Sequence, residues 1–327
     1  MEGNFTFTGE FSGPAVAAVL TVEMILALIA NGVVLSITLY QRKSWKQSST
    51  IFFTSLILAH LVLNLLYLPF TIIALAAGEW IFGSTDEEKK GTCAFAAWML
   101  WSGYSVLSMT LAAISFDRFL FIVKPHLHKW FMRPWVALTL TIAIWILSAV
   151  FGTGPFINIG HYSYVDELGF CTIIGGDIRA FVVILVVCLV VGTIFVTSFW
   201  TLCFTRSYFK AQSVIAGESV YASKKKRLFG VFGSMLLIYG TYYLMETLPF
   251  FLQIFIFLPY EIYVTGYIVF CFVTIASPII QSYFRPEIKS FLVSCCPLLF
   301  TCINLACLVI SMTGSSEDHS PDSHYCC

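Results

Sequence analysis

Seven long apolar runs constrain the fold of this chain more than any other feature of its sequence. A helix that crosses the hydrocarbon core of a bilayer needs about 20 mainly apolar residues. The runs cover residues 16–40, 51–77, 93–123, 135–157, 180–204, 228–257 and 261–283. The sequence therefore predicts an all-α membrane protein built as a bundle of seven transmembrane helices.

The composition agrees with lipid as the main solvent of the chain. Of the 327 residues, 58% are hydrophobic and 11% are charged, whereas an ordinary soluble domain is about 25% charged. The formal net charge is zero, so no basic field favours nucleic acid as a partner. The 11 cysteines form no CxxC pair and no metal-ligand spacing. We find no nucleophile–base constellation either, and we expect no enzyme activity, no cofactor and no metal.

The distribution of basic residues predicts the orientation in the membrane. Only Lys89, Lys90 and Arg179, among 18 Lys and Arg residues, lie on the side that also holds the N-terminus. Basic residues collect on the cytoplasmic side of a membrane. We therefore expect a multi-pass protein of the plasma membrane with its N-terminus outside, where the NFT sequon at Asn4 can carry a glycan.

An Asp-Arg pair, Asp117-Arg118, stands near the end of the third run in the stretch SFDRFLFIVKP. An ion pair beside lipid is costly. The predicted topology places Arg118 at the cytoplasmic edge, where a long side chain reaches water. The cost is small there, and a partner protein can reach the pair.

Further motifs follow one another along the chain. They are Asn31 in ANGVVL, Pro69, WIFG at 80–83, Cys93 with Arg118 25 residues later, Trp145 with Pro155 ten residues later, Pro249 in LPFF, and SPIIQSYFRPEIK at the end of the seventh run. Each motif is weak alone. Together, in this order and at these offsets, they make residues 16–290 resemble the rhodopsin-like (class A) G protein-coupled receptors, which end the bundle with a short C-terminal surface helix.

The resemblance implies two features at opposite sides of the membrane. Cys93 and Cys171 match the cysteines that tie the second outer loop to the third span, and a disulfide persists on that oxidising side. Arg118 matches the arginine that is paired with its neighbour, here Asp117, at rest and that faces a heterotrimeric G protein on activation. Phe119, which replaces the usual Tyr, Lys124 and Pro125 border the same surface.

Three departures from the family pattern fall where its members hold a sodium ion. The expected Asp, Ser and Asn are replaced by His60, Leu107 and Ser277. An imidazole and a leucine do not supply the missing oxygen ligands, so we predict no sodium site. His60 is either a pH sensor or a neutral side chain hydrogen-bonded to Ser277 or Asn31.

Two further departures alter the relay between the pocket and the G protein surface. Thr247 replaces the usual Trp of the sixth span, and Gln281 replaces the usual Tyr of the seventh. The receptor then signals through a modified relay, with basal activity, or it couples poorly and acts as a decoy. We favour signalling because Arg118 and the basic cytoplasmic face remain.

The family's offsets also give a candidate ligand pocket. The lining is apolar and aromatic, which suits a small hydrophobic or lipid-like molecule, with a short peptide as the alternative. Leu100 replaces the Asp that binds amines, and Cys271 replaces the Lys that binds retinal. The candidates are Leu100, Trp101, Tyr104, Glu246, Thr247, Phe250, Phe251, Tyr267 and Cys271.

The chain divides into an outer N-terminus (1–15), the receptor core (16–290) and an apolar, Cys-rich tail (291–327). Cys295 and Cys296 are candidates for palmitoylation, and serines among acidic residues near the end suit phosphorylation and arrestin binding. The segment 291–312 either lies on the membrane surface or forms an eighth span.

Two functions of other classes remain open from the sequence. One is a non-signalling membrane protein that pairs with other receptors. The other is a transporter that uses Glu23, His60 and Glu246 as a proton path, although the chain shows neither inverted repeats nor broken spans.

Overall fold

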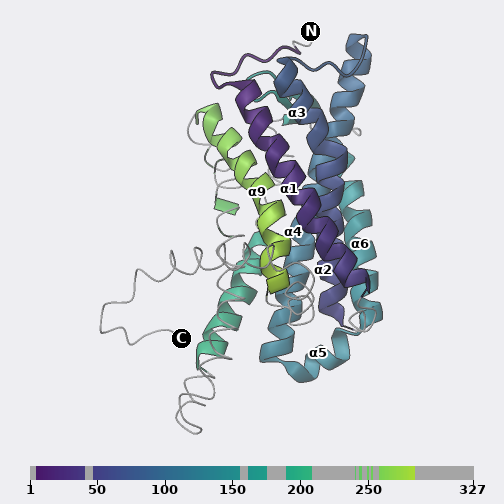
Figure 1. Cartoon of the computed structure of the whole chain (residues 1–327). Helices are drawn as coiled ribbons and strands as arrows, with labels where there is room; N and C mark the ends of the chain where they lie inside the picture. Colours follow the sequence, from purple (N-terminus) through teal and green to yellow (C-terminus); the bar gives the residue numbers. More distant parts are fainter. Residues whose placement is uncertain are drawn as a thin grey trace, which may run out of the picture.

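The long apolar runs fold as helices that stand side by side (Figure 1). The computed structural model describes residues 5–40, 47–154, 161–174, 189–207 and 258–283, with positions 240, 243, 244, 249 and 252. Within these residues, six helices are long and apolar enough to cross a membrane. They are Gly13–Tyr40 (α1), Ser48–Ala77, Asp86–Val123 (α4), Pro134–Gly152 (α6), Leu189–Ser207 (the fifth span) and Tyr260–Ile280 within α9 (Tyr260–Tyr283). The run predicted over 228–257 lies almost wholly outside the described residues.

The second span is not a uniform helix. It passes from α2 (Ser48–Val62) through a wide π-helical turn, η2 (Leu63–Tyr67), into α3 (Leu68–Ala77). Pro69 stands in the first turn of α3, and proline lacks the N–H that would continue the preceding helix. The wide turn leaves Leu63, Asn64 and Tyr67 all buried.

The third span, α4, has 38 residues and is about 57 Å long at 1.5 Å per residue. It therefore extends well beyond a hydrocarbon core of about 30 Å. A capping box starts it, because Thr85 Oγ1 accepts from the N–H of Glu88 and the Glu88 carboxylate accepts from the N–H of Thr85. Acidic side chains in the first turn complement the positive end of the helix dipole.

A β-hairpin crosses the end of the bundle at which α4 begins. β1 (His161–Val165) pairs antiparallel with β2 (Phe170–Ile174), with Tyr164 opposite Cys171. Gly169 turns the chain between them with a φ of 75°, a conformation that glycine adopts without penalty. We call this the hairpin end.

The short helix α5 (Pro125–Phe131) follows α4 directly and lies at the opposite end of the bundle from the N-terminus (Figure 1). None of its residues is buried. We call this the α5 end.

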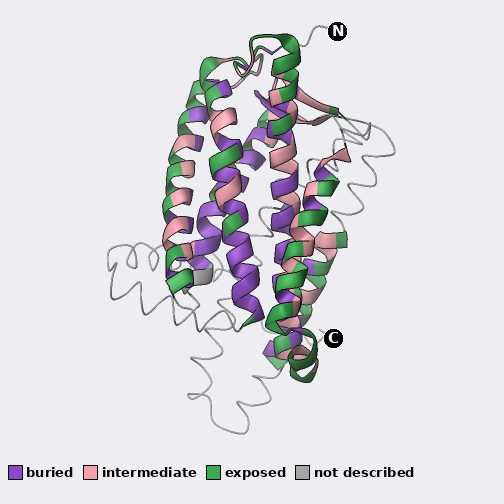
Figure 2. Cartoon of the chain, turned by 90° about the vertical axis from the view of Figure 1, so that its right-hand side faces the viewer, coloured by how far each residue is buried: buried purple, intermediate pink, exposed green. Residues whose placement is uncertain are grey.

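Burial separates the inner and outer faces of the helices. Figure 2 shows buried residues facing the interior while exposed residues cover the outside. The outer faces of α1 and α6 carry large apolar side chains such as Val22, Ile29, Ile146 and Val150, each more than half exposed. Such surfaces suit a hydrocarbon solvent, as expected for membrane-spanning helices.

Candidate functional site

Asp117 is a hub at the α5 end. Its side chain is buried, and Oδ1 accepts hydrogen bonds from Ser48 Oγ at 2.5 Å and from His128 Nε2 at 3.0 Å. Ser48 begins α2, and His128 belongs to α5. One carboxylate therefore joins three helices through hydrogen bonds of the strong, charge-assisted kind.

The geometry adds His128 to the expected pairing of Asp117 with Arg118. Among the residues that the structure describes, the ion-pair partner of Asp117 is His128. Asp117 hydrogen-bonds to α2 and α5, and its charge also attracts the half-buried Arg118 that follows it.

The other predicted coupling residues surround this hub. Phe119 is half-buried, and its ring lies 5.6 Å from the ring of Trp200 in the fifth span. Lys124 and Pro125 are exposed where α4 passes into α5. Among the residues that the structure describes, Lys124 and Pro125 thus form an exposed surface next to the buried Asp117.

A polar cluster occupies the core of the bundle around His60. Asn31 Nδ2 donates to the carbonyl oxygens of Ala27 and Thr274 at 2.8 and 2.9 Å. Asn31 Oδ1 is then the acceptor, and His60 Nδ1 donates to it across 3.2 Å. Asn64 Nδ2 continues the cluster toward Thr274 Oγ1, 3.3 Å away.

This cluster contains His60, one of the residues predicted to replace the family's sodium ligands. Of the two interpretations of His60, the structure shows a buried ring bonded to Asn31. Leu107 is buried in the apolar core, and Ser277 is buried in α9. Glu23 lies eight residues before Asn31 on α1, about 12 Å along the helix, which is too far for direct proton transfer to His60.

Two predicted pocket residues of α4 support the hairpin. Trp101 Nε1 donates to Thr172 Oγ1 of β2 at 3.2 Å, and the Trp101 and Tyr104 rings lie 5.9 Å apart. Tyr104 also lies 6.4 Å from the ring of Phe270 in α9. The half-buried Leu100 packs against the same core.

Tyr267 and Cys271 face the interior from α9, and both are buried. The space beside Tyr267 is filled by Phe170 of β2, whose ring stacks on Tyr267 at 4.9 Å. Cys171, the next residue, forms the predicted disulfide with Cys93 of α4. The hairpin is therefore fastened to the bundle and inserts an aromatic ring into it.

A crevice lies at a different place, between α4, α6 and the fifth span. It is lined by Tyr104, Ser105, Ser108, Met109, Phe151, Val190 and Val191. Of the predicted pocket residues, Tyr104 alone borders it among those that the structure describes.

Several predicted residues fall outside the described part of the chain. They are Asn4, Glu246, Thr247, Phe250, Phe251, Cys295, Cys296 and the side chain of Gln281. The segment 291–312 and the short surface helix expected after the seventh span also lie outside it.

Comparison with known families gives the chain its class. The family described as "7 transmembrane receptor (rhodopsin family)" matches residues 30–281, well over half of the chain. The chain belongs to this family. It is thus a multi-pass membrane protein, as the apolar runs predicted.

Individual relatives match part of this receptor. The C-X-C chemokine receptor type 3 of Rattus norvegicus is 36% identical over 135 residues, which are 41% of this chain and 34% of the relative. Opsin-5 of Homo sapiens is 29% identical over 148 residues, 44% of this chain and 38% of the relative. The chain thus spans little more than a third of the length of these curated relatives.

A solved structure covers nearly the whole receptor. Squid rhodopsin aligns with a TM-score of 0.69 and 18% identity, over 96% of this chain and 94% of the rhodopsin chain. This similarity shows the fold and confirms the predicted seven-helix bundle.

Three residues that contact the predicted site residues were not predicted from the sequence. Ser48 and His128 bind Asp117 from other helices, and Phe170 fills the space beside Tyr267. Nothing in a single sequence distinguishes His128 from His126 two residues earlier. Phe170 carried one signal, because it directly precedes a cysteine expected to fix its loop to the third span.

Proposed function

We propose that this receptor transmits a small-molecule signal from outside the cell to a heterotrimeric G protein through the surface around Asp117-Arg118. The observation that carries the proposal is the geometry of Asp117, which is occupied by Ser48 and His128. Arg118, the next residue, is half-buried beside this hub, at the same end of the bundle as the exposed Lys124.

The orientation in the plasma membrane is part of the proposal. Lys124, Lys129 and Arg133 lie at the α5 end, and basic residues favour the cytoplasmic side. The hairpin end, with its disulfide, would then face the oxidising outside. The surface around Arg118 would be cytoplasmic, where G proteins are found.

We also propose that the relay inside the bundle works without sodium. Asn31, His60, Asn64 and Thr274 bond to one another and to backbone carbonyls. A cation site needs oxygen ligands or a compensating negative charge, and the His60 imidazole provides neither. Exchanging sodium for potassium at constant ionic strength should leave the signal unchanged, and a specific sodium effect would contradict this part.

The test is ligand-free activation of each G protein class in cells that display equal amounts of wild type, Arg118→Ala and Arg133→Ala. Arg133 is the matched control, because it is an exposed basic residue at the same end. We expect a basal signal that Arg118→Ala abolishes and Arg133→Ala keeps. A basal signal that survives Arg118→Ala would overturn the coupling role of Arg118. The absence of a wild-type signal with every G protein class would favour the decoy alternative.

A further inference from the structure

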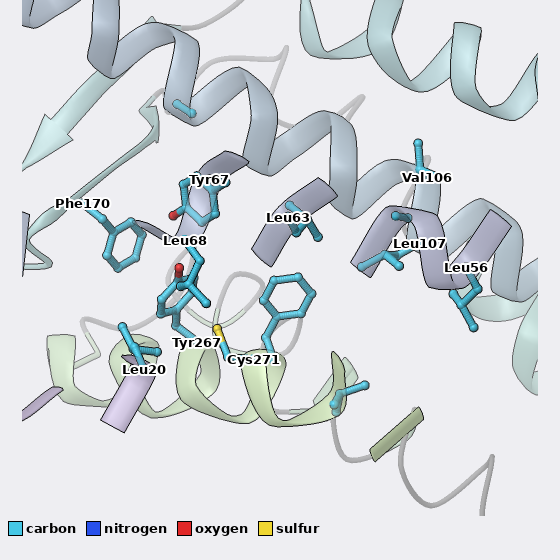
Figure 3. Packing of buried hydrophobic residues seen from close by; sticks show 14 of the residues in the cluster. Leu20, Leu56, Leu63, Tyr67, Leu68, Val106, Leu107, Phe170, Tyr267 and Cys271 are labelled. Carbon is cyan, nitrogen blue, oxygen red and sulfur yellow. The ribbon is translucent and has the colours of Figure 1, made fainter. Parts of the chain in front are cut away.

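The crevice between α4, α6 and the fifth span lies on a different side of α4 from the contact with the second span. Leu107 lies among buried side chains of the second span, such as Leu56 and Leu63 (Figure 3). Ser108, the next residue, is turned about 100° around the helix axis, and it lines the crevice instead. The crevice is therefore distinct from the packed core of the bundle.

The crevice lies near the middle of the membrane. At 1.5 Å per residue along α4, Ser108 is about 22 Å from Cys93 and about 15 Å from Arg118, and these two residues stand toward opposite ends of the bundle. A hydrocarbon core is about 30 Å thick, so Ser108 lies close to its midplane. Lipid head groups remain at the membrane surfaces, and a ligand at this depth is therefore a molecule dissolved in the hydrocarbon.

One wall of the crevice is apolar and borders the lipid. It is formed by Met109 of α4, Phe151 of α6, and Val190 and Val191 of the fifth span. Phe151 is 37% exposed, so this side is reached from the hydrocarbon. The volume that a water-sized group can fill is about 20 Å³, which is enough for about one such group. The crevice thus has room for a small polar head whose chain lies along the apolar wall.

Ser108 brings an unused hydrogen-bonding group to the crevice. It is 6% exposed, and its Oγ has no hydrogen-bond partner within the described part of the chain. Other hydroxyls on the same three helices donate to the carbonyl four residues earlier, as Ser105, Thr141 and Thr193 do. A buried hydroxyl that lacks such a bond is unfavourable, so Ser108 favours a ligand that supplies the missing partner.

Ser105 provides the complementary half of the site. It precedes Ser108 by three residues, so the two side chains are neighbours on one face of α4, and both line the crevice. Ser105 Oγ donates to the Trp101 carbonyl at 2.9 Å, which uses its one proton and leaves its lone pairs as acceptors. Ser108 Oγ keeps its proton to donate. A ligand group that both accepts and donates, such as a hydroxyl, therefore satisfies both serines.

We propose that this crevice binds a neutral aliphatic alcohol that reaches it through the lipid. The hydroxyl of the alcohol accepts a hydrogen bond from Ser108 and donates one to Ser105, while its chain lies against the apolar wall. A charged head group would lose its hydration without gaining a counter-ion, because none of the described lining residues is charged. This binding goes beyond the G protein function proposed above and does not depend on it.

The test is photolabelling of the purified full-length receptor in lipid nanodiscs with an octanol that carries a diazirine on its chain. Light converts the diazirine into a carbene that inserts into nearby side chains, and mass spectrometry locates the label. We expect saturable labelling of peptides that contain Met109, Phe151 or Val190. Compared at equal concentrations in the lipid, 1-hexanol should suppress this labelling about fivefold more strongly than dipropyl ether, an isomer that accepts hydrogen bonds but donates none.

Two pairs of variants locate the site. Ser108→Ala should weaken suppression by 1-hexanol about fivefold. Ser102→Ala should leave it unchanged, because Ser102 is another buried serine of α4 whose hydroxyl has no partner among the described residues, but it lies outside the crevice lining. Val191→Phe fills the crevice and should abolish the labelling, whereas Val196→Phe, at a 61% exposed position of the fifth span, should not. Ser108→Ala removes a single atom, so the test stands even if Val191→Phe fails to fold.

The outcomes separate the alcohol site from G protein coupling. Labelling that does not saturate, or that Ser108→Ala and Ser102→Ala change equally, would overturn the alcohol site. Equal suppression by 1-hexanol and dipropyl ether would overturn it as well, and this is the result expected if a water molecule already satisfies both serines. Each of these results leaves the Arg118 test standing. Saturable labelling that depends on Ser108 supports the site even if Arg118→Ala has no effect on signalling.

Discussion

The two ends of the bundle are held together in different ways. At the hairpin end, the loops are fastened to the helices by a disulfide, by backbone hydrogen bonds to the N-terminal segment and by packed aromatic rings. At the α5 end, one carboxylate joins three helices. Trp80 is fully buried among aromatic neighbours at the first end. At the second end α5 has no buried residue. The first arrangement resists movement, and the second depends on two hydrogen bonds that a partner can replace.

This difference suggests where the molecule changes shape. Coupled motions draw on the regions of lowest local stability. The hairpin end has little freedom to move, while small shifts at Asp117 would move α2, α4 and α5 relative to one another. We therefore expect substitutions at the hairpin end to lower stability more than substitutions at the α5 end.

The largest effect should come from opening the hairpin end. Cys93→Ser combined with Cys171→Ser removes a cross-link between residues 78 apart, and we expect a loss of about 3 kcal/mol in stability. Thermal unfolding in nanodiscs measures it. Cys203→Ser, which removes a half-buried free thiol, is the control, and equal melting temperatures for the double variant and wild type would contradict the role of the disulfide.

A smaller effect should come from the α5 end. In a double-mutant cycle between Asp117→Asn and His128→Ala, we expect a coupling of about 1 kcal/mol in the free energy of unfolding, because one charge-assisted hydrogen bond joins the two side chains. The matched cycle uses His126→Ala, an exposed histidine on the same helix, and should show almost no coupling. Similar coupling for both histidines would remove His128 from its assigned role.

The smallest effect should be a pH dependence at the hairpin turn. A hydrogen bond between their carboxyl groups lowers the pKa of Asp166 and raises the pKa of Glu167. Because the pKa of Asp166 is lowered on folding, its ionised carboxylate stabilises the turn above the unfolded pKa, and that stabilisation is lost as the pH falls through the folded pKa. Because the pKa of Glu167 is raised on folding, its protonated carboxyl stabilises the turn below the unfolded pKa, and that stabilisation is lost as the pH rises through the folded pKa.

The unfolded pKa values of Asp and Glu are both about 4. The two contributions therefore overlap near pH 4, where the carboxyl pair shares one proton and the turn is most stable. Amide hydrogen exchange at Leu168 and Gly169, which donate to the Val165 carbonyl, should show protection that falls from pH 4 to pH 7 after correction for intrinsic rates. Glu167→Gln keeps a donor at every pH and should flatten the profile. An unchanged slope in that variant would rule out the shared proton.

The helical architecture could be predicted from the sequence because a chain that crosses lipid must do so in long apolar helices. Spans of about 20 apolar residues are readable from one chain. The predicted boundaries agree with α1 and α9 within three residues, whereas α4 begins seven residues before the predicted start at 93. The disulfide was predictable through the family resemblance. The wide turn in the second span was not, although Pro69 marked its position.

The partners of individual polar side chains could not be predicted. Asp117 and Arg118 are adjacent in sequence, but the hydrogen-bond partners of the carboxylate, Ser48 and His128, come from other helices. Likewise, the family's offsets located Tyr267 but gave no sign that a loop residue would fill the space beside it. Such contacts depend on packing between distant segments.

The central claim is that the α5 end activates a G protein through Arg118. Guanine-nucleotide exchange on purified G proteins, measured with the purified receptor in nanodiscs and no added ligand, tests it most directly. The account predicts faster exchange with wild type than with empty nanodiscs, and a return to the empty rate with Arg118→Ala. Equal exchange rates for wild type and Arg118→Ala would contradict it.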